Sequence, residues 1–152
     1  MKRKIMVCGA ALGLVLGWTG FAHASPVASH VLENAPSATV SVVSADGEAI
    51  AAAECYYPVY SGDSGAMVCF NPTGEHLYIC DNASDGHHPV ARYYRSDSSG
   101  LKTKHADVGY GTCLDHNLSI PESGWINYQA CNYEGSTQLS CGYFSGRISA
   151  RG

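Results

Sequence analysis

Cysteine spacing constrains the fold of this 152-residue chain more than any other feature. Of its seven cysteines, Cys8 lies in an N-terminal segment that has the pattern of a cleaved export signal. The remaining six are even in number and include no C-x₂-C pair, the spacing in which zinc ligands usually occur. We therefore expect three disulfides and an oxidising compartment. These six residues are Cys55, Cys69, Cys80, Cys113, Cys131 and Cys141.

The pairing of the six cysteines stays open, with one exception. Cys131 and Cys141 flank the turn sequence Glu-Gly-Ser-Thr, so we expect them to bridge a hairpin. Each disulfide is expected to stabilise the fold by about 2–4 kcal/mol, mainly because it restricts the unfolded chain.

The first 24 residues have the three parts of a secretory signal peptide. A positive start at Lys2 to Lys4 precedes an apolar segment over 5–16, and Ala22 to Ala24 forms a small-x-small cleavage site. No later segment approaches the ~20 apolar residues that span a bilayer, so we expect no membrane insertion after signal removal. The expected organisation is a signal peptide at 1–24, a flexible leader at 25–37 and one domain at 38–152.

The charge of the mature chain narrows the classes of partner. After Lys2, Arg3 and Lys4 are removed with the signal, six basic residues remain against 13 acidic ones, a formal charge of −7. Nucleic acids and anionic membrane surfaces attract clustered Lys and Arg, so we expect neither as a partner. The composition fits a secreted, extracellular protein, and we expect its partner to be an unknown extracellular protein or glycan.

Short β-like segments repeat along the domain, and no amphipathic helix of ordinary length appears. Within 66–80, an Asn-Pro-Thr-Gly-Glu turn joins two strands, and Leu77 and Ile79 alternate with His76, Tyr78 and Cys80. We expect a single all-β domain, a small antiparallel β-sandwich or barrel stapled by disulfides. The predicted strands are 38–44, 47–60, 66–70, 76–80, 90–96, 125–133 and 138–149, and the polar segment 96–112 is predicted as a loop or frayed edge.

The turn from Asp81 to His88 carries two carboxylates and two histidines, which raises the question of a metal site. A calcium loop of the EF-hand type needs oxygen ligands at its third and twelfth positions. Ala83 and Arg92 stand at these two positions, so that template fails. His87 and His88 are adjacent, and adjacent side chains on an extended strand point to opposite faces. We therefore expect no metal and no cofactor, although His76 or His105 could lie close in space to one of the pair.

The segment Gly62-Asp63-Ser64-Gly65 resembles the nucleophile loop of chymotrypsin-like proteases. In that family the catalytic His and Asp precede the Ser on a full β-barrel. Here only 39 mature residues precede Ser64, and His30 is the one histidine among them. A common turn composition explains the tetrapeptide better, so we expect no catalytic residue and no enzymatic activity.

Tyrosine is the compositional exception, with ten residues in the chain. Tyrosines of small β-proteins mostly fill core edges, and in each Tyr-Tyr pair we expect one ring inside and one outside. Exposed aromatic rings also supply rigid contact area for a protein or glycan. The candidate binding residues are Tyr56, Tyr57, Tyr60, Arg92, Tyr93, Tyr94 and Trp125.

From Gly65 to its end the chain resembles a group of small secreted actinobacterial proteins, such as those of Streptomyces. The matching motifs are Gly74-Glu75, Cys80-Asp81, Ser84 to His87, Val90-Ala91 and Cys131-Asn132-x-Glu134-Gly135 followed by Cys141. Glu75 and Ser84 depart from the Asp and Ala that are frequent in the group. The resemblance implies an exported, disulfide-containing β-fold and implies no catalytic residue.

Three functional hypotheses follow. The leading one is a secreted, non-enzymatic protein that binds a cell-envelope or extracellular protein or glycan. The alternative is a secreted protease inhibitor that presents a rigid loop, either 60–65 or the polar segment 95–105, in which Arg95 or Lys102 could enter the protease. A remote alternative is a serine hydrolase that uses Ser64.

Overall fold

The computed structural model describes residues 35–43 and 49–152, which form ten strands and no helix. The predicted signal peptide and residues 25–34 of the predicted leader lie outside the described residues. Because the described part has no helix, it has no helical segment that could cross a bilayer. The strands are β1 (Ser37–Val43), β2 (Ala49–Tyr60), β3 (Ala66–Asn71), β4 (His76–Asp81), β5 (His88–Arg95), β6 (Lys102–His105), β7 (Cys113–Asn117), β8 (Trp125–Glu134), β9 (Thr137–Cys141) and β10 (Ile148–Ser149).

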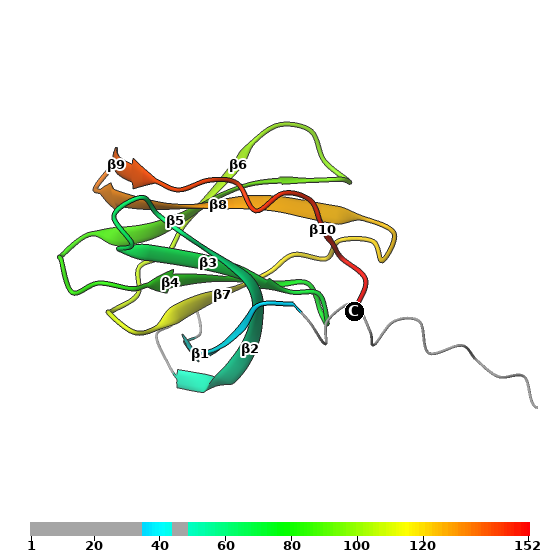
Figure 1. The fold of residues 1–152 in the computed structure, drawn as a ribbon, viewed down its shortest axis with the longest axis horizontal. Helices are drawn as coiled ribbons and strands as arrows, with labels where there is room; N and C mark the ends of the chain where they lie inside the picture. Colours follow the sequence, from blue (N-terminus) through cyan, green and yellow to red (C-terminus); the bar gives the residue numbers. More distant parts are fainter. Residues whose placement is uncertain (1–34, 44–48) are drawn as a thin grey trace, which may run out of the picture.

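The strands form two sheets, which confirms the prediction of an all-β, disulfide-stapled domain. The first sheet closes into a barrel in the order β1-β2-β3-β4-β7. The second has the order β10-β8-β5-β6, and β9 also pairs with β8. Figure 1 shows the second sheet as a layer over β3 and β4, with β1 and β2 on the opposite side of the barrel.

Strand β7 closes the barrel. It pairs antiparallel with β4, from His76 opposite Asn117 to Cys80 opposite Cys113. On its other side it pairs parallel with the end of β1, where Val42 lies opposite Cys113. The sequence pattern did not predict β7, because a five-residue strand whose second half is polar lacks a clear alternation. The segment 96–112 was predicted to be a loop or a frayed edge. In the structure, part of this segment forms β6, the exposed edge strand of the second sheet.

Strand β3 is buried on both faces because it separates two hydrophobic cores. Ala66, Val68 and Phe70 lie in the core between the two sheets. Met67 and Cys69, at the alternate positions, lie in the core inside the barrel. A strand that is covered on both faces usually has a continuous apolar sequence, and residues 66–70 (Ala-Met-Val-Cys-Phe) have this pattern.

Strand β4 contributes to the same two cores. Leu77 and Ile79 pack between the sheets, whereas Tyr78 and Cys80 pack inside the barrel. This division confirms the alternation predicted from the sequence. The β3–β4 hairpin turns at Gly74, whose φ of 81° lies in the left-handed region that glycine adopts readily.

The second sheet packs onto the barrel through β8. Ile126, Tyr128 and Ala130 alternate along β8 and are fully buried between the sheets. The Tyr128 hydroxyl donates a 2.8 Å hydrogen bond to the Tyr57 carbonyl of β2. Burial of this ring raises the pKa of Tyr128 far above its usual range. The hydrogen bond satisfies the one polar atom that this large side chain brings into the core.

Disulfides join all six cysteines of the domain. Cys55 bonds to Cys69 and Cys80 bonds to Cys113, so two bridges lie within the barrel. The third joins Cys131 to Cys141, which confirms the bridged hairpin of β8 and β9. The last residues of the predicted leader also join the barrel, since the Tyr57 amide donates to the Pro36 carbonyl and Ser37 begins β1.

The bridge that closes the longest loop is expected to stabilise the fold most. The chain-entropy relation gives about 3.7 kcal/mol for Cys80–Cys113, about 3.0 for Cys55–Cys69 and about 2.7 for Cys131–Cys141, from sequence separations of 33, 14 and 10. Replacing both cysteines of one bridge by Ala should therefore lower the free energy of unfolding most for Cys80–Cys113, less for Cys55–Cys69 and least for Cys131–Cys141. Urea denaturation of the three double variants measures these losses. A larger loss for the Cys131–Cys141 pair than for the Cys80–Cys113 pair would contradict this order.

Candidate functional site

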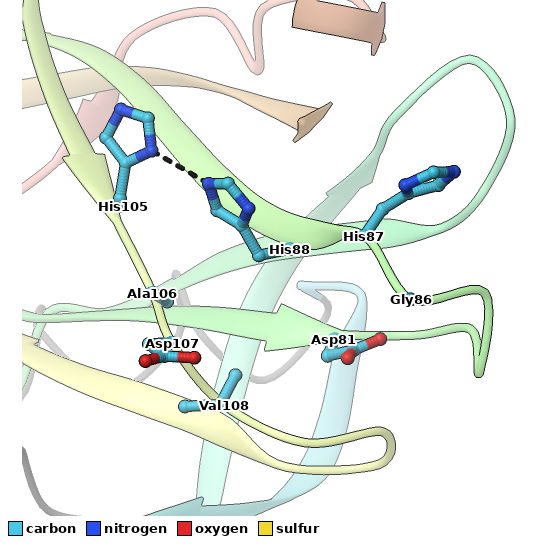
Figure 2. Close-up of a pocket in the computed structure, with 8 residues that line it drawn as sticks. All are labelled: Asp81, Gly86, His87, His88, His105, Ala106, Asp107 and Val108. Atoms are coloured by element: carbon cyan, nitrogen blue, oxygen red, sulfur yellow. Dashed lines mark hydrogen bonds between the residues drawn. The ribbon is translucent and has the colours of Figure 1, made fainter. Parts of the chain in front are cut away.

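A pocket of about 620 Å³ lies at the ends of three strands, β4, β5 and β6 (Figure 2). One wall is Asp81, the last residue of β4, and another is the Gly86–His88 turn that enters β5. The third is the segment that follows β6, in which the Ala106 amide donates to the Pro89 carbonyl and extends the pairing of β5 and β6. The pocket is lined by Asp81, Gly86, His87, His88, His105, Ala106, Asp107 and Val108.

Two histidines meet on one wall of the pocket. His88 Nε2 and His105 Nδ1 are 2.9 Å apart and share a hydrogen bond. Their ring centroids are 5.2 Å apart, and the ring of Tyr133 from β8 packs against both. The register of β5 and β6, in which Val90 pairs with His105, brings the two histidines together. The sequence indicated His105 only as a possible neighbour of His87 or His88. The contact with His88 could not be predicted, because β6 was not predicted.

Carboxylates lie on the other side of the same pocket (Figure 2). Asp81 is buried, and this burial raises the pKa of its carboxyl; the nearby charge of Asp85 raises it further. A 3.1 Å hydrogen bond from the Ala83 amide to Asp81 Oδ1 acts in the opposite direction. Asp107 is exposed to solvent. The pocket therefore offers hydrogen-bond acceptors on one side and imidazoles on the other.

His87 points away from the histidine pair, as Figure 2 shows. Its Nδ1 lies 2.8 Å from Glu134 Oε2 at the end of β8. This hydrogen bond raises the pKa of His87, and the charges of Asp85, Glu134 and Asp63 add to the effect. The opposite directions of His87 and His88 confirm the prediction that these adjacent residues do not share one face.

The residues of the Asp81–His88 turn and His76 do not converge on one point. His76 lies at the start of β4, where its Nδ1 is 2.7 Å from Asp115 Oδ1 on β7. Asp85 instead accepts hydrogen bonds from the His87 amide and from Asn132. Within residues 35–43 and 49–152, no group of three or more His, Cys, Asp or Glu side chains is arranged to hold a metal ion.

The Gly-Asp-Ser-Gly segment is a hydrogen-bonded turn between β2 and β3. Asp63 Oδ1 accepts from the Ser61 hydroxyl at 2.5 Å and from the Gly65 amide at 3.0 Å. Ser64 has a φ of 62° and is exposed. In the described part of the chain, no histidine forms a hydrogen bond with the Ser64 hydroxyl, whereas a catalytic Ser needs such a base.

The turn is joined to the second sheet through Asn132 of β8, which is 1% exposed. Its Nδ2 lies 3.3 Å from Asp63 Oδ2 and 3.1 Å from Asp85 Oδ2. A Cβ at Gly65 would lie 2.3 Å from the same nitrogen, so a side chain there would displace the Asn132 amide. One buried amide thus connects the Gly-Asp-Ser-Gly turn, the turn after β4 and β8.

The residues predicted to form a binding surface do not form one surface. Tyr93 is buried in the core between the sheets, and Tyr94 beside it is 39% exposed, as expected for a Tyr-Tyr pair on a strand. Tyr57 also packs against this core, while the Tyr56 hydroxyl donates to Glu54 on the barrel. Tyr60 is exposed at the end of β2.

Arg92 and Trp125, the two remaining predicted residues, share the outer face of the second sheet with Tyr94. Tyr94 lies opposite Asn127 in the register of β5 and β8, so Arg92, Tyr94 and Trp125 point to the same side. The Tyr94 ring lies 5.7 Å from that of Phe144, and the Arg147 guanidinium lies 4.3 Å from the Trp125 ring centroid. The structure thus brings Arg92, Tyr94 and Trp125 together, and it separates them from the barrel tyrosines.

The raised pKa of His87 gives a directional prediction. A pKa raised in the folded state adds stability that is fully present below the unfolded value of about 6.5 and is lost as pH rises through the folded value. Glu134→Gln removes the first cause, so the His87 pKa should fall and the variant should lose more stability at pH 5 than at pH 9. Titration of the imidazole resonances by NMR measures the pKa.

The matched control is Glu122→Gln, which precedes β8 at the end opposite Glu134. It should leave the His87 titration unchanged. An unchanged His87 pKa in Glu134→Gln would contradict the assigned cause.

Comparison with known proteins leaves the site to be interpreted from its own residues. No protein-family model, curated protein or solved structure matches this chain.

Proposed function

We propose that this protein is a secreted, non-enzymatic binding protein whose pocket holds a polyhydroxylated ligand, a glycan of the cell envelope or the extracellular space. The observation that carries the proposal is the 620 Å³ pocket with imidazoles on one side and carboxylates on the other. Small-molecule sites commonly measure about 300–1,000 Å³ and place a few polar groups to orient the ligand.

The chemistry of the pocket favours a sugar. A carboxylate such as Asp107 accepts hydrogen bonds from two hydroxyls, and an imidazole such as His105 donates or accepts one. The half-exposed Val108 adds apolar surface to the same pocket. Sugars present hydroxyls around an apolar ring face, so this combination of polar and apolar groups suits them. The excess of acidic residues favours neutral or cationic glycans over anionic ones.

The three disulfides support an oxidising compartment as the location of this protein. The signal-peptide pattern of residues 1–24 supports the extracellular space as that compartment. The resemblance to small secreted actinobacterial proteins supports the same location and remains part of the proposal.

The protease-inhibitor alternative has weaker support. Inhibition by a basic loop needs a free cationic side chain that enters the protease. Arg95 instead donates to both carboxylate oxygens of Asp97, at 2.5 and 2.6 Å, and to the Ser119 carbonyl at 2.6 Å. The loop 60–65 is held against β9, where the Asp63 amide donates to the Ser140 hydroxyl. Lys102, the other candidate cation, is the first residue of β6 and pairs with Tyr93 of β5. It therefore lies on a paired strand and not at the tip of a loop.

The test is binding of the mature chain, residues 25–152, to a glycan array and to isolated cell-wall fractions. We expect a defined set of glycans to bind and Asp107→Asn to weaken binding about tenfold, because hydrogen bonds to charged groups contribute roughly 1.5–3 kcal/mol. Glu122→Gln is the matched control and should bind as the unmodified protein does. Flat signals on both materials would overturn the proposal. Loss of binding on Tyr94→Ala but not on Asp107→Asn would move the binding site to the outer face of the second sheet.

A further inference from the structure

The histidine pair holds two imidazole nitrogens close together on the wall of the pocket. His88 Nε2 and His105 Nδ1 face each other across 2.9 Å, and they come from two neighbouring strands of fixed register. The ring of Tyr133 supports both imidazoles from the side of β8. Both histidines border the open pocket rather than the core, so an ion has access to them from solvent.

The separation of the two nitrogens is close to the span of one metal ion. Imidazole nitrogens bind a metal ion at about 2.0–2.1 Å, so two of them lie about 2.9 Å apart at the right angle of a tetragonal Cu²⁺ site and about 3.3 Å apart in a tetrahedral Zn²⁺ site. The observed 2.9 Å contact already has the first spacing, and rotation of the two rings would turn both nitrogen lone pairs toward one ion. The half-exposed His88 and the exposed His105 can make such a movement without disturbing either core.

We propose that His88 Nε2 and His105 Nδ1 form a two-nitrogen site for a divalent late transition-metal ion, with Cu²⁺ bound most tightly. Imidazole is a preferred ligand of copper, nickel and zinc, and affinity at such sites rises to Cu²⁺ and falls again at Zn²⁺. Asp81 and Asp107 line the same pocket and attract a cation. The remaining coordination positions of the ion face the pocket and hold water.

Metal binding replaces the hydrogen bond between the rings. One of the two facing nitrogens carries the proton of this bond in the neutral pair, and that ring moves its proton to its outer nitrogen when the metal binds. Protons compete with the metal for the same lone pairs, so affinity falls on acidification. The proposal concerns a second kind of ligand and does not depend on glycan binding.

The test is titration of chelator-treated mature protein with Cu²⁺, followed by calorimetry and by electron paramagnetic resonance. We expect one ion per chain at the pair and a resonance spectrum with hyperfine coupling to two imidazole nitrogens. His88→Gln and His105→Gln should each weaken this site at least about tenfold, because even an outer-shell change costs a metal site 10–100-fold. Zn²⁺ and Ni²⁺ should bind the same site more weakly than Cu²⁺.

His87→Gln is the matched control, since this neighbouring imidazole is bonded to Glu134 and points away from the pair. It should retain the affinity and spectrum of the unmodified protein. Coupling to a single imidazole, or equal loss of affinity in His87→Gln and His88→Gln, would overturn the proposal. Circular dichroism of each variant separates loss of the ligand from loss of the fold. The titration contains no glycan, so failure of the proposed function leaves its outcome unaffected.

Discussion

The pairing of β4 with β7 is the interaction on which the rest of the structure depends. It closes the barrel, and the Cys80–Cys113 bridge fixes it at one end. Once β4 is held there, Leu77 and Ile79 form the floor on which the second sheet packs. The same strand ends at Asp81, so its position also sets one wall of the pocket. Stability and the site are therefore coupled through one short strand.

Local features of the chain were sufficient to predict much of this fold. The β3–β4 hairpin follows from its turn residues and from the alternation of Leu77 and Ile79 with Tyr78 and Cys80, all within neighbouring positions. The bridge between Cys131 and Cys141 follows for the same reason. Strand β7 was missed because what stabilises it is distant in sequence: it pairs with β1 more than 60 residues earlier and with β4. No pattern within five residues contains that information.

The candidate site shows the same limit. That His87 and His88 point apart could be derived from strand geometry alone. The partner of each could not, because Glu134 and His105 are placed by the register of β5 with β8 and β6. The aromatic set was divided for a similar reason. Tyr93 and Tyr94 differ only by the face of β5 on which they lie, but which face is covered depends on how the two sheets pack.

The Gly-Asp-Ser-Gly turn shows that the packing demands of a tight turn can by themselves account for this tetrapeptide. Asp63 accepts the hydrogen bonds that hold the turn, and Gly65 leaves room for the Asn132 amide. The turn hydrogen bonds favour Asp at position 63, and the close approach of Asn132 favours Gly at position 65. A serine protease has the same two residues beside its nucleophilic Ser. In this chain, the tetrapeptide and the buried Asn132 of β8 form a packing joint between the two sheets. Searches for enzymes by this motif alone would therefore collect such joints as well as active sites.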